Sequence, residues 1–179
     1  MADTLTWHYV ERWAAERPDS EALVFEKERL TWRDFKVSMD AVALAFLEAG
    51  VMKGDRVALL SMARTESLTT YMDARKIRAV WLGLSPKFTI EELRYQIGDC
   101  RPSVLIALRE YLGNDLSETI RALMKEFSFI RKVLILGEPM EGTENFHAFA
   151  QKPRKELEAA LDLRSKEIRE SDEALLMYT

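Results

Sequence analysis

The side chains that could serve as nucleophiles or metal ligands are few and far apart in this 179-residue chain. Cys100 is the only cysteine, and His8 and His147 are the only histidines. This set lacks the closely spaced cysteine and histidine ligands of a zinc site. A lone thiol also builds no disulfide framework, which indicates a reducing compartment. We therefore interpret Cys100 as a small buried hydrophobe and predict no metal ligand.

Three aspartates are the remaining candidates for acid–base chemistry, and each has a simpler structural interpretation. Asp34 follows Thr31 at the spacing of a capping box, in which two residues satisfy the first turn of a helix. Asp55 comes directly after Lys-Gly and is interpreted as a turn residue. Asp73 lies near two basic residues within a predicted helix and is interpreted as a solvated charge. We therefore predict no catalytic residue in this chain.

Two segments lie where a phosphate-binding loop could occur, and neither carries the groups that such a loop needs. After the strand predicted at residues 56–60 comes Ser-Met-Ala-Arg-Thr, which has no glycine through which the backbone could approach a pyrophosphate. It also lacks the acidic pair of a phospho-receiver module. Residues 137–143, Gly-Glu-Pro-Met-Glu-Gly-Thr, have the glycine spacing of a phosphate loop. They lack its lysine, and their two glutamates would repel phosphate.

Hydrophobic periodicity and capping motifs define the elements that would hold these side chains. Leu5, Tyr9 and Trp13 fall at helical spacing, with Val10 and Ala14 as further candidates, and are expected to form the apolar face of a first helix. A second helix begins at the capping box of Asp34 and ends at Gly50. Another capping box, Thr-x-x-Glu, begins at Thr89. The larger aromatic residues are interpreted as core, not as cofactor contacts: Trp32, Tyr71, Trp81 and Tyr95.

Short apolar strands alternate with amphipathic helices through the middle of the chain. Strands separated by about two dozen residues, with one helix in each gap, need crossover connections. Such crossovers are right-handed and give a parallel sheet covered on its faces. The predicted fold class is therefore α/β: a mostly parallel β-sheet of βαβ repeats with helices on both faces, after an N-terminal helix and a short β-hairpin. The elements predicted after the first helix (residues 4–17) are hairpin strands at 22–25 and 30–32, parallel strands at 56–60, 80–84, 103–106 and 133–136, helices at 65–79 and 115–127, a charged helix within 152–170, and a last buried strand at 174–178.

Composition places the chain among ordinary globular proteins, with 47% hydrophobic and 31% charged residues. The net charge of −4 and the interleaving of basic with acidic residues argue against nucleic-acid binding. The charge runs at residues 26–29 and 152–158 are interpreted as solvated faces. The start of the chain shows no signal peptide, and no run approaches the roughly 18 apolar residues that span a bilayer. We expect a cytoplasmic protein with no transmembrane segment.

Five blocks, in order and spacing, resemble the N-terminal region of the adenylate-forming (AMP-binding) ligases, a family that includes the acyl-CoA synthetases. Residues 47–60 contain Gly-Val-Met-Lys-Gly-Asp-Arg-Val-Ala-Leu, which is similar to the family pattern G-V-x-x-G-D-R-V-A-L. Residues 30–35 resemble L-T-Y-x-E-L, and residues 84–93 resemble x-N-P-x-x-T-x-x-E-L. Residues 16–24 look like the opening of the family, and residues 172–179 look like the strand that enters its phosphate loop.

The resemblance implies a function that the residues alone do not reveal. Ligases of this family bind ATP, Mg²⁺ and a small-molecule carboxylate, form an acyl-adenylate with release of pyrophosphate, and pass the acyl group to a thiol, often coenzyme A. Residues 1–179 would then be a truncated N-terminal subdomain that ends just before the phosphate loop. Thr179 is the one predicted cofactor-binding residue. We expect this partial domain of a larger enzyme to be inactive by itself.

Three departures from the family pattern stand out. Arg78 occupies a position where the family usually has a small glycine, Ser85 replaces the usual asparagine, and residues 62–64 replace a loop that often contains proline and asparagine. Three interpretations stay open: a fragment of an acyl-CoA ligase, a fragment of a ligase that loads a carrier protein, and a non-catalytic α/β interaction module. Dimerisation with a second copy is also expected to be possible, because the last strand would lack neighbours.

Overall fold

Helices and short strands alternate along residues 5–178, which are the residues that the computed structural model describes. The helices are α1 (Thr6–Glu16), α2 (Trp32–Glu48), α3 (Thr65–Lys76), α4 (Ile90–Cys100), α5 (Ser117–Glu126), α6 (Phe146–Ala150), the 3-10 turn η1 (Lys155–Leu157) and α7 (Glu158–Lys166). The strands are β1 (Glu21–Phe25), β2 (Glu28–Thr31), β3 (Arg56–Leu60), β4 (Val80–Leu84), β5 (Val104–Leu108), β6 (Glu110–Tyr111), β7 (Asn114–Asp115), β8 (Lys132–Leu136), β9 (Glu144–Asn145) and β10 (Leu175–Leu176).

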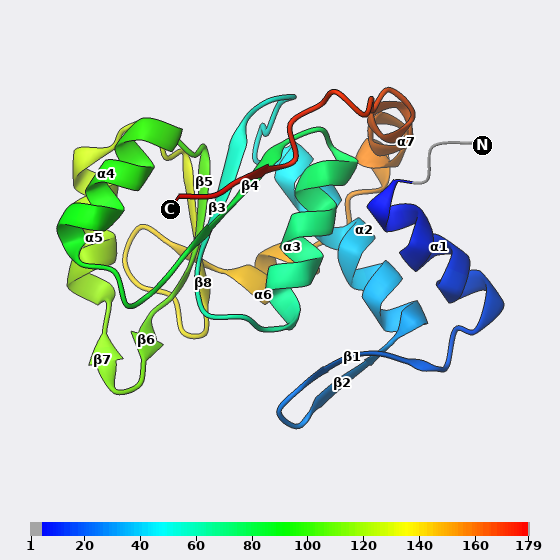
Figure 1. Cartoon of the computed structure of the whole chain (residues 1–179), viewed down its shortest axis with the longest axis horizontal. Helices are drawn as coiled ribbons and strands as arrows, with labels where there is room; N and C mark the ends of the chain where they lie inside the picture. The colour runs from blue at the N-terminus through cyan, green and yellow to red at the C-terminus, as the bar shows by residue number, and fades with distance from the viewer. Residues whose placement is uncertain (1–4, 179) are drawn as a thin grey trace.

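Six of these strands form one sheet in the order β10-β4-β3-β5-β8-β9, and every neighbouring pair is parallel. Helices α4 and α5 lie on one side of the sheet, and α2, α3 and α6 lie on the other (Figure 1). The chain places β4 on one side of β3 and then crosses to β5 on the other side, so α3 and α4 cover opposite faces. The predicted α/β class, with a β1–β2 hairpin before the sheet, is confirmed.

Alternate residues of the inner strands supply two separate apolar cores, because successive side chains of a strand point to opposite faces. Val57 and Leu59 pack with α2, α3 and α6, whereas Ala58 and Leu60 pack with α4 and α5. All four side chains are buried. Burial on both faces explains why these strands read as continuous apolar runs in the sequence.

Both predicted capping boxes are present and fix the starts of two helices. The hydroxyl of Thr31 accepts from the backbone N–H of Asp34 at 3.2 Å, and the Asp34 carboxylate accepts from the backbone N–H of Thr31 at 3.1 Å. Thr89 and Glu92 make the same pair of bonds at the start of α4. Gly50 follows α2 with a φ of +74°, a left-handed conformation that suits glycine at a helix end.

The buried face predicted for the first helix is correct for Val10 and wrong for Tyr9. Helix α1 buries Trp7 and Val10, which are 1% and 2% exposed, whereas Tyr9 is 48% exposed. The prediction omitted Trp7, which lies with Val10 on the observed buried face, and Leu5 packs against the same cluster. The observed face places the large Trp7 indole against Phe35 and Met39 of α2. Burying that indole removes more apolar surface from water, so packing selects this face.

Three residues interpreted from local composition also have different environments in the structure. Asp73, expected to be solvated, is 0% exposed, and Arg154, from a charge run expected to be solvated, is 2% exposed. The guanidinium of Arg154 donates to the carbonyl of Phe149 at 2.8 Å and to the carboxylate of Glu48 at 2.7 Å. Tyr95, expected in the core, is 70% exposed. Composition alone does not report which face of a helix each residue occupies.

Some elements are shorter than predicted, or were not predicted. The helix predicted at residues 115–127 begins at Ser117, after the small β6–β7 hairpin. The charged segment 152–170 forms η1 and α7 in place of one longer helix. Strand β9 and helix α6 were not predicted, because elements of two and five residues are too short to show a hydrophobic period.

The last strand, expected to be buried over residues 174–178, is an outer strand of two residues. Leu175 and Leu176 pair in parallel with Trp81 and Leu82 of β4. They are 43% and 37% exposed. An apolar sequence does not by itself distinguish an inner strand from an outer one. The parallel direction was predicted correctly, so β10 runs toward the same edge of the sheet as β3, β4, β5 and β8.

Candidate functional site

The carboxyl ends of parallel strands form the edge at which α/β proteins bind ligands. In this chain the loop after β3 leads into α3 at that edge, and the loop after β4 leads into α4. Because β4 and β5 flank β3, the direction of the connections reverses at β3, and α/β proteins typically bind ligands at such a switch point. The start of α3 and the segment through β10 are therefore the two regions where a site would form.

Glu66, in the first turn of α3, is a buried carboxylate at this edge. Nε of Arg64 donates to its Oε2 at 2.6 Å, and Nε2 of His147 lies 3.1 Å from its Oε1. The neighbouring Thr65 hydroxyl donates to the carboxylate of Glu28 on β2 at 2.7 Å. Burial alone would raise the pKa of Glu66, but the hydrogen bonds from His147 and Arg64 outweigh it and lower the pKa to about 2.

This arrangement makes Glu66 a fixed anion that ties together the segments around the start of α3. A negative charge suits the positive end of a helix dipole. The same charge makes the start of α3 unsuitable for a phosphate group, which prefers unoccupied backbone N–H donors. The start of α3 is thus stabilised by its own ion pairs.

A second set of charges holds the segment that leads into β10. We call it the Asp172 clamp, and it consists of Asp172, Arg78, Lys53 and Arg75. Nε of Arg78 and Nζ of Lys53 lie 3.0 Å and 3.2 Å from the Asp172 carboxylate, which also accepts from the backbone N–H of Arg169 at 3.0 Å. Arg75 donates to the backbone carbonyl of Asp172 at 3.3 Å. Burial would raise the pKa of Asp172, but these donors outweigh it and the pKa falls well below its usual range.

Tyr178 anchors the chain just after β10. Its hydroxyl lies 2.7 Å from Oδ2 of Asp99 and 3.2 Å from the carbonyl of Gln96, both on α4. Burial and the hydrogen bond to Asp99 raise the pKa of Tyr178, so the phenol stays protonated and donates. Thr179, the predicted cofactor-binding residue, lies outside the described residues. Its predicted role therefore stays a prediction.

A shallow cavity of ≈ 380 Å³ lies between α3 and β10. Tyr71, Trp81 and Leu175 contribute most of its aromatic and aliphatic surface. The indole Nε1 of Trp81 donates to the Thr70 hydroxyl at 3.0 Å, which fixes the ring. The cavity can bury an apolar group, but its lining residues do not include a pair of titratable groups suited to acid–base chemistry.

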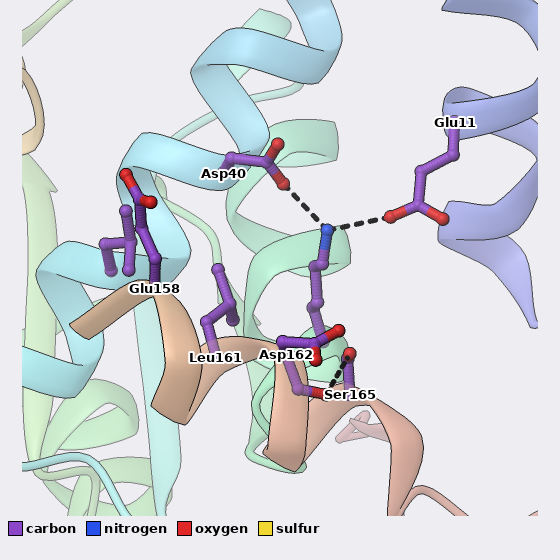
Figure 2. Close-up of a pocket in the computed structure, with 8 residues that line it drawn as sticks. Glu11, Asp40, Glu158, Leu161, Asp162 and Ser165 are labelled. Atoms are coloured by element: carbon purple, nitrogen blue, oxygen red, sulfur yellow. Dashed lines mark hydrogen bonds and ion pairs between the residues drawn. The ribbon is translucent and has the colours of Figure 1, made fainter. Parts of the chain in front are cut away.

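A cavity of ≈ 260 Å³ lies among α1, α2, α3 and α7 (Figure 2). Nζ of Lys76 reaches between Glu11 and Asp40, at 2.9 Å and 2.7 Å from their carboxylates. Burial would lower the pKa of Lys76, but these two bonds outweigh it and raise the pKa. Nearby Asp73 is fully buried, and neither of its carboxylate oxygens has a hydrogen-bond partner. Burial raises the pKa of Asp73 well above its usual value, and repulsion from Asp40 adds to the effect.

The cluster around Lys76 joins helices and is not a candidate catalytic site. It lies toward the end of α3 opposite to Glu66, away from the carboxyl edge of the sheet. Its cation is already held by two carboxylates, and Asp73 is sealed from solvent. The buried charges here are therefore interpreted as part of the packing of α1, α2 and α3.

The other sequence candidates are likewise structural. Asp34 serves as a cap, and the Asp55 carboxylate accepts from the turn N–H of Met52 at 3.1 Å. Cys100 is buried at the end of α4, and burial raises the pKa of its thiol to about 11, so it is not an activated nucleophile. Residues 137–143 lead into β9 and not directly into a helix. Among residues 5–178 there is no cluster of three or more potential metal ligands, and no helix is long and apolar enough to cross a membrane.

Comparison with known proteins gives the family of this chain. The family profile described as "AMP-binding enzyme" matches residues 10–179. The chain is 33% identical over 124 residues to the long-chain-fatty-acid–CoA ligase of Bacillus subtilis. The matched segment covers 68% of this chain and 21% of that protein. It is also 28% identical over 172 residues to the acyl-CoA ligase sidI of Aspergillus fumigatus, and this match covers 90% of this chain and 29% of that protein. The chain belongs to the AMP-binding enzyme family.

Solved structures agree with this assignment at the level of the fold. A Rhodopseudomonas palustris protein assigned as a long-chain-fatty-acid CoA ligase superposes with a TM-score of 0.75 at 22% identity, covering 99% of this chain and 39% of that one. The acetoacetyl-CoA synthetase of Streptomyces lividans gives 0.75 at 23% identity over 83% of this chain and 25% of that one. The chain thus spans well under half the length of these relatives. The resemblance to adenylate-forming ligases noted in the sequence is confirmed.

Proposed function

We propose that this chain is part of an adenylate-forming ligase that activates a small-molecule carboxylate with ATP and transfers the acyl group to coenzyme A. The overall reaction joins the carboxylate to AMP with release of pyrophosphate, and the thiol then displaces AMP. The family match over residues 10–179 and the similarity to two acyl-CoA ligases support this proposal. A soluble cytoplasmic location and a homodimer stay predictions.

The observation that carries the proposal is the position of β10. This strand is parallel to β4 and is followed by Met177 and Tyr178, at the place where the family pattern predicts the entry to the phosphate loop. Thr179 would be the first residue of that loop. The Asp172 clamp before β10 and the Tyr178 hydroxyl after it fix both ends of this short segment.

The described residues do not by themselves fit ATP, Mg²⁺ or coenzyme A. The loop after β3 has no glycine, and Glu66 at the start of α3 is a fixed anion. The loop after β8 carries the exposed residues Glu138 and Glu141. Glu138 and Glu141 at this edge oppose a triphosphate, and Glu66 occupies the helix start that could otherwise receive a phosphate. We therefore assign no reaction step to these residues and expect the isolated 179-residue chain to form no acyl-adenylate.

Carboxylate-dependent exchange of pyrophosphate into ATP tests this proposal. The complete reading frame that contains this chain should catalyse the exchange with carboxylates of one chain-length or aromatic class, and the 179-residue chain should not. Adding coenzyme A or a carrier protein as the acyl acceptor separates the proposed function from its alternative, a ligase that loads a carrier protein. Absence of exchange with every carboxylate would favour a non-catalytic module.

A further inference from the structure

Residue 78 occupies a backbone position that strongly favours glycine. Helix α3 ends in a Schellman motif, in which the N–H of Ala79 bonds to the carbonyl of Ala74 at 2.7 Å and the N–H of Arg78 bonds to that of Arg75 at 2.9 Å. The motif requires a left-handed residue after the helix, and Arg78 has a φ of +65°. An arginine here is strained in a way that glycine is not. The departure from the family pattern at this position therefore needs a compensating interaction.

The side chain of Arg78 supplies that interaction. Its Nε lies 3.0 Å from Oδ2 of Asp172, and its Nη1 lies 3.0 Å from the carboxylate of Glu167. The Arg78 and Asp172 side chains are only 10% and 8% exposed, whereas Glu167 is 53% exposed. Charge-assisted bonds between shielded groups are much stronger than those of exposed surface pairs. The bond to Asp172 is thus the dominant contact of the Arg78 guanidinium.

Arg75 also donates to the carbonyl of Glu173 at 3.1 Å, and Asp172 is the last side-chain anchor before the chain joins the sheet. Two residues later, the carbonyl of Ala174 accepts from the backbone N–H of Trp81 at 3.0 Å, which starts the pairing of β10 with β4. Strand β10 has only two residues, and both leucines are more than one third exposed. Apolar burial therefore contributes little to holding β10, and the polar contacts on either side of it must hold it in place.

We infer that Arg78 is a positioning residue, which acts through Asp172 to fix where the chain enters β10 and hence where the residues after Tyr178 leave the sheet. The placement of β10 follows from contacts within this chain. Its consequence for a nucleotide loop rests on the proposed function. Arg78 does not line the cavity between α3 and β10, and it acts on β10 through Asp172, with the exposed Glu167 as its second partner.

Amide hydrogen exchange of the 179-residue chain tests the inference, because the Trp81 N–H bonds to Ala174 and so reports the docking of β10. Arg78→Gly removes the guanidinium and relieves the backbone strain together. We expect the Trp81 amide to exchange about 10-fold to 100-fold faster in this variant, the range for loss of a hydrogen bond to a charged group. The backbone amides that join β3 to β5 should keep the hydrogen-exchange rates of the native chain. Asp172→Asn should give the same local pattern.

Two further variants separate positioning from strain. Glu26→Gly relieves a comparable left-handed residue, with a φ of +51° in the β1–β2 turn, and should leave Trp81 exchange unchanged. Arg78→Lys keeps a cation and the strain, so its Trp81 exchange should lie closer to that of the native chain than Arg78→Gly does. If strain alone mattered, Arg78→Gly would exchange more slowly than the native chain. That order, or unchanged exchange in Arg78→Gly, overturns the inference.

The complete reading frame tests the functional consequence separately. Arg78→Gly should raise the KM for ATP in pyrophosphate exchange by about 10-fold, and Glu26→Gly should not change it. Faster Trp81 exchange with an unchanged KM would overturn the link to the nucleotide loop while the clamp stands. No pyrophosphate exchange by the native enzyme would overturn the proposed function, and the hydrogen-exchange result would still decide the inference about Arg78.

Discussion

The inner strands and the outer strand of the same sheet are held by different forces. Strands β3, β4, β5 and β8 bury apolar side chains in both cores, and most of these side chains are fully buried. Strand β10 exposes both of its leucines and is fixed by the Asp172 clamp before it and by Tyr178 after it. Apolar burial makes the inner strands cooperative with the whole domain, whereas a strand held by a few polar contacts can detach alone.

The largest expected effect contrasts one leucine from each region. Leu105→Ala on β5 removes a side chain that is 0% exposed and should destabilise the chain by about 2–5 kcal/mol, because the cavity adds to the lost burial. Leu176→Ala on β10 should cost only about 1 kcal/mol, because more than a third of that residue is already exposed to water. Urea unfolding monitored by circular dichroism measures both. Equal losses would contradict the contrast.

Glu66→Gln tests whether a polar network at the edge of the sheet can also carry substantial stability. The pKa of Glu66 is lowered from 4.5 to about 2, so its ionised form stabilises the fold above pH 4.5 and this contribution fades as the pH falls toward 2. We expect a loss of about 2 kcal/mol at pH 7, reduced from the full shift because His147 is half exposed. Urea titrations at pH 7, 5 and 3.5 should show the difference shrinking. A constant difference would contradict the ionic origin.

The sequence revealed the inner sheet well, for a clear physical reason. Continuous apolar runs and capping boxes depend on local sequence, so β3 and β4 were predicted with their observed ends, and α2 and α4 with their starts. The outer position of β10 depends on contacts made by Arg78 and Asp172, which are 94 residues apart and have no shared local pattern. Likewise, nothing in the local sequence distinguishes the anchored Glu66 from the unpartnered Asp73.

Asp73→Asn is expected to stabilise the chain, since it removes an ionisable group from a site without hydrogen-bond partners. A raised pKa means that the folded state retains a proton that the unfolded chain releases above about pH 4, so Asp73 reduces stability as the pH rises from there. The variant should gain about 1 kcal/mol at pH 7 and nothing at pH 4. Urea unfolding at the two pH values checks this. A loss of stability at pH 7 would show that the Asp73 carboxyl has a partner.

The most local expected effect comes from the anchor after β10. Tyr178→Phe removes the hydroxyl that bonds to Asp99 and should cost about 1 kcal/mol locally, visible as faster exchange of the Trp81 amide. Tyr95→Phe is the matched control, because it removes a hydroxyl from a neighbouring tyrosine that is 70% exposed. Equal effects of the two variants would mean that the Tyr178 hydroxyl does not hold β10.

The candidate site was predictable only in part. The sequence predicted a buried, structural Cys100, and Cys100 is buried. That residues 137–143 bind no phosphate stays a prediction, made from a missing lysine that is visible without a structure. The family blocks located the approach to the phosphate loop, but Thr179 itself stays a prediction. The role of Arg78 was missed, although its departure from the usual glycine was the signal. Only the φ of +65° and the contact with Asp172 explain that departure.

The most direct test of the account is native-state hydrogen exchange of the unmodified chain at increasing urea concentration. The account predicts that the Trp81 amide, which bonds to Ala174, exchanges through a small opening of low free energy and weak urea dependence, since detaching β10 exposes little surface. Amides between β3 and β5 should require global unfolding, with its higher free energy and steep urea dependence. If Trp81 shares the free energy and urea slope of those inner amides, β10 is part of the cooperative core and the account is wrong.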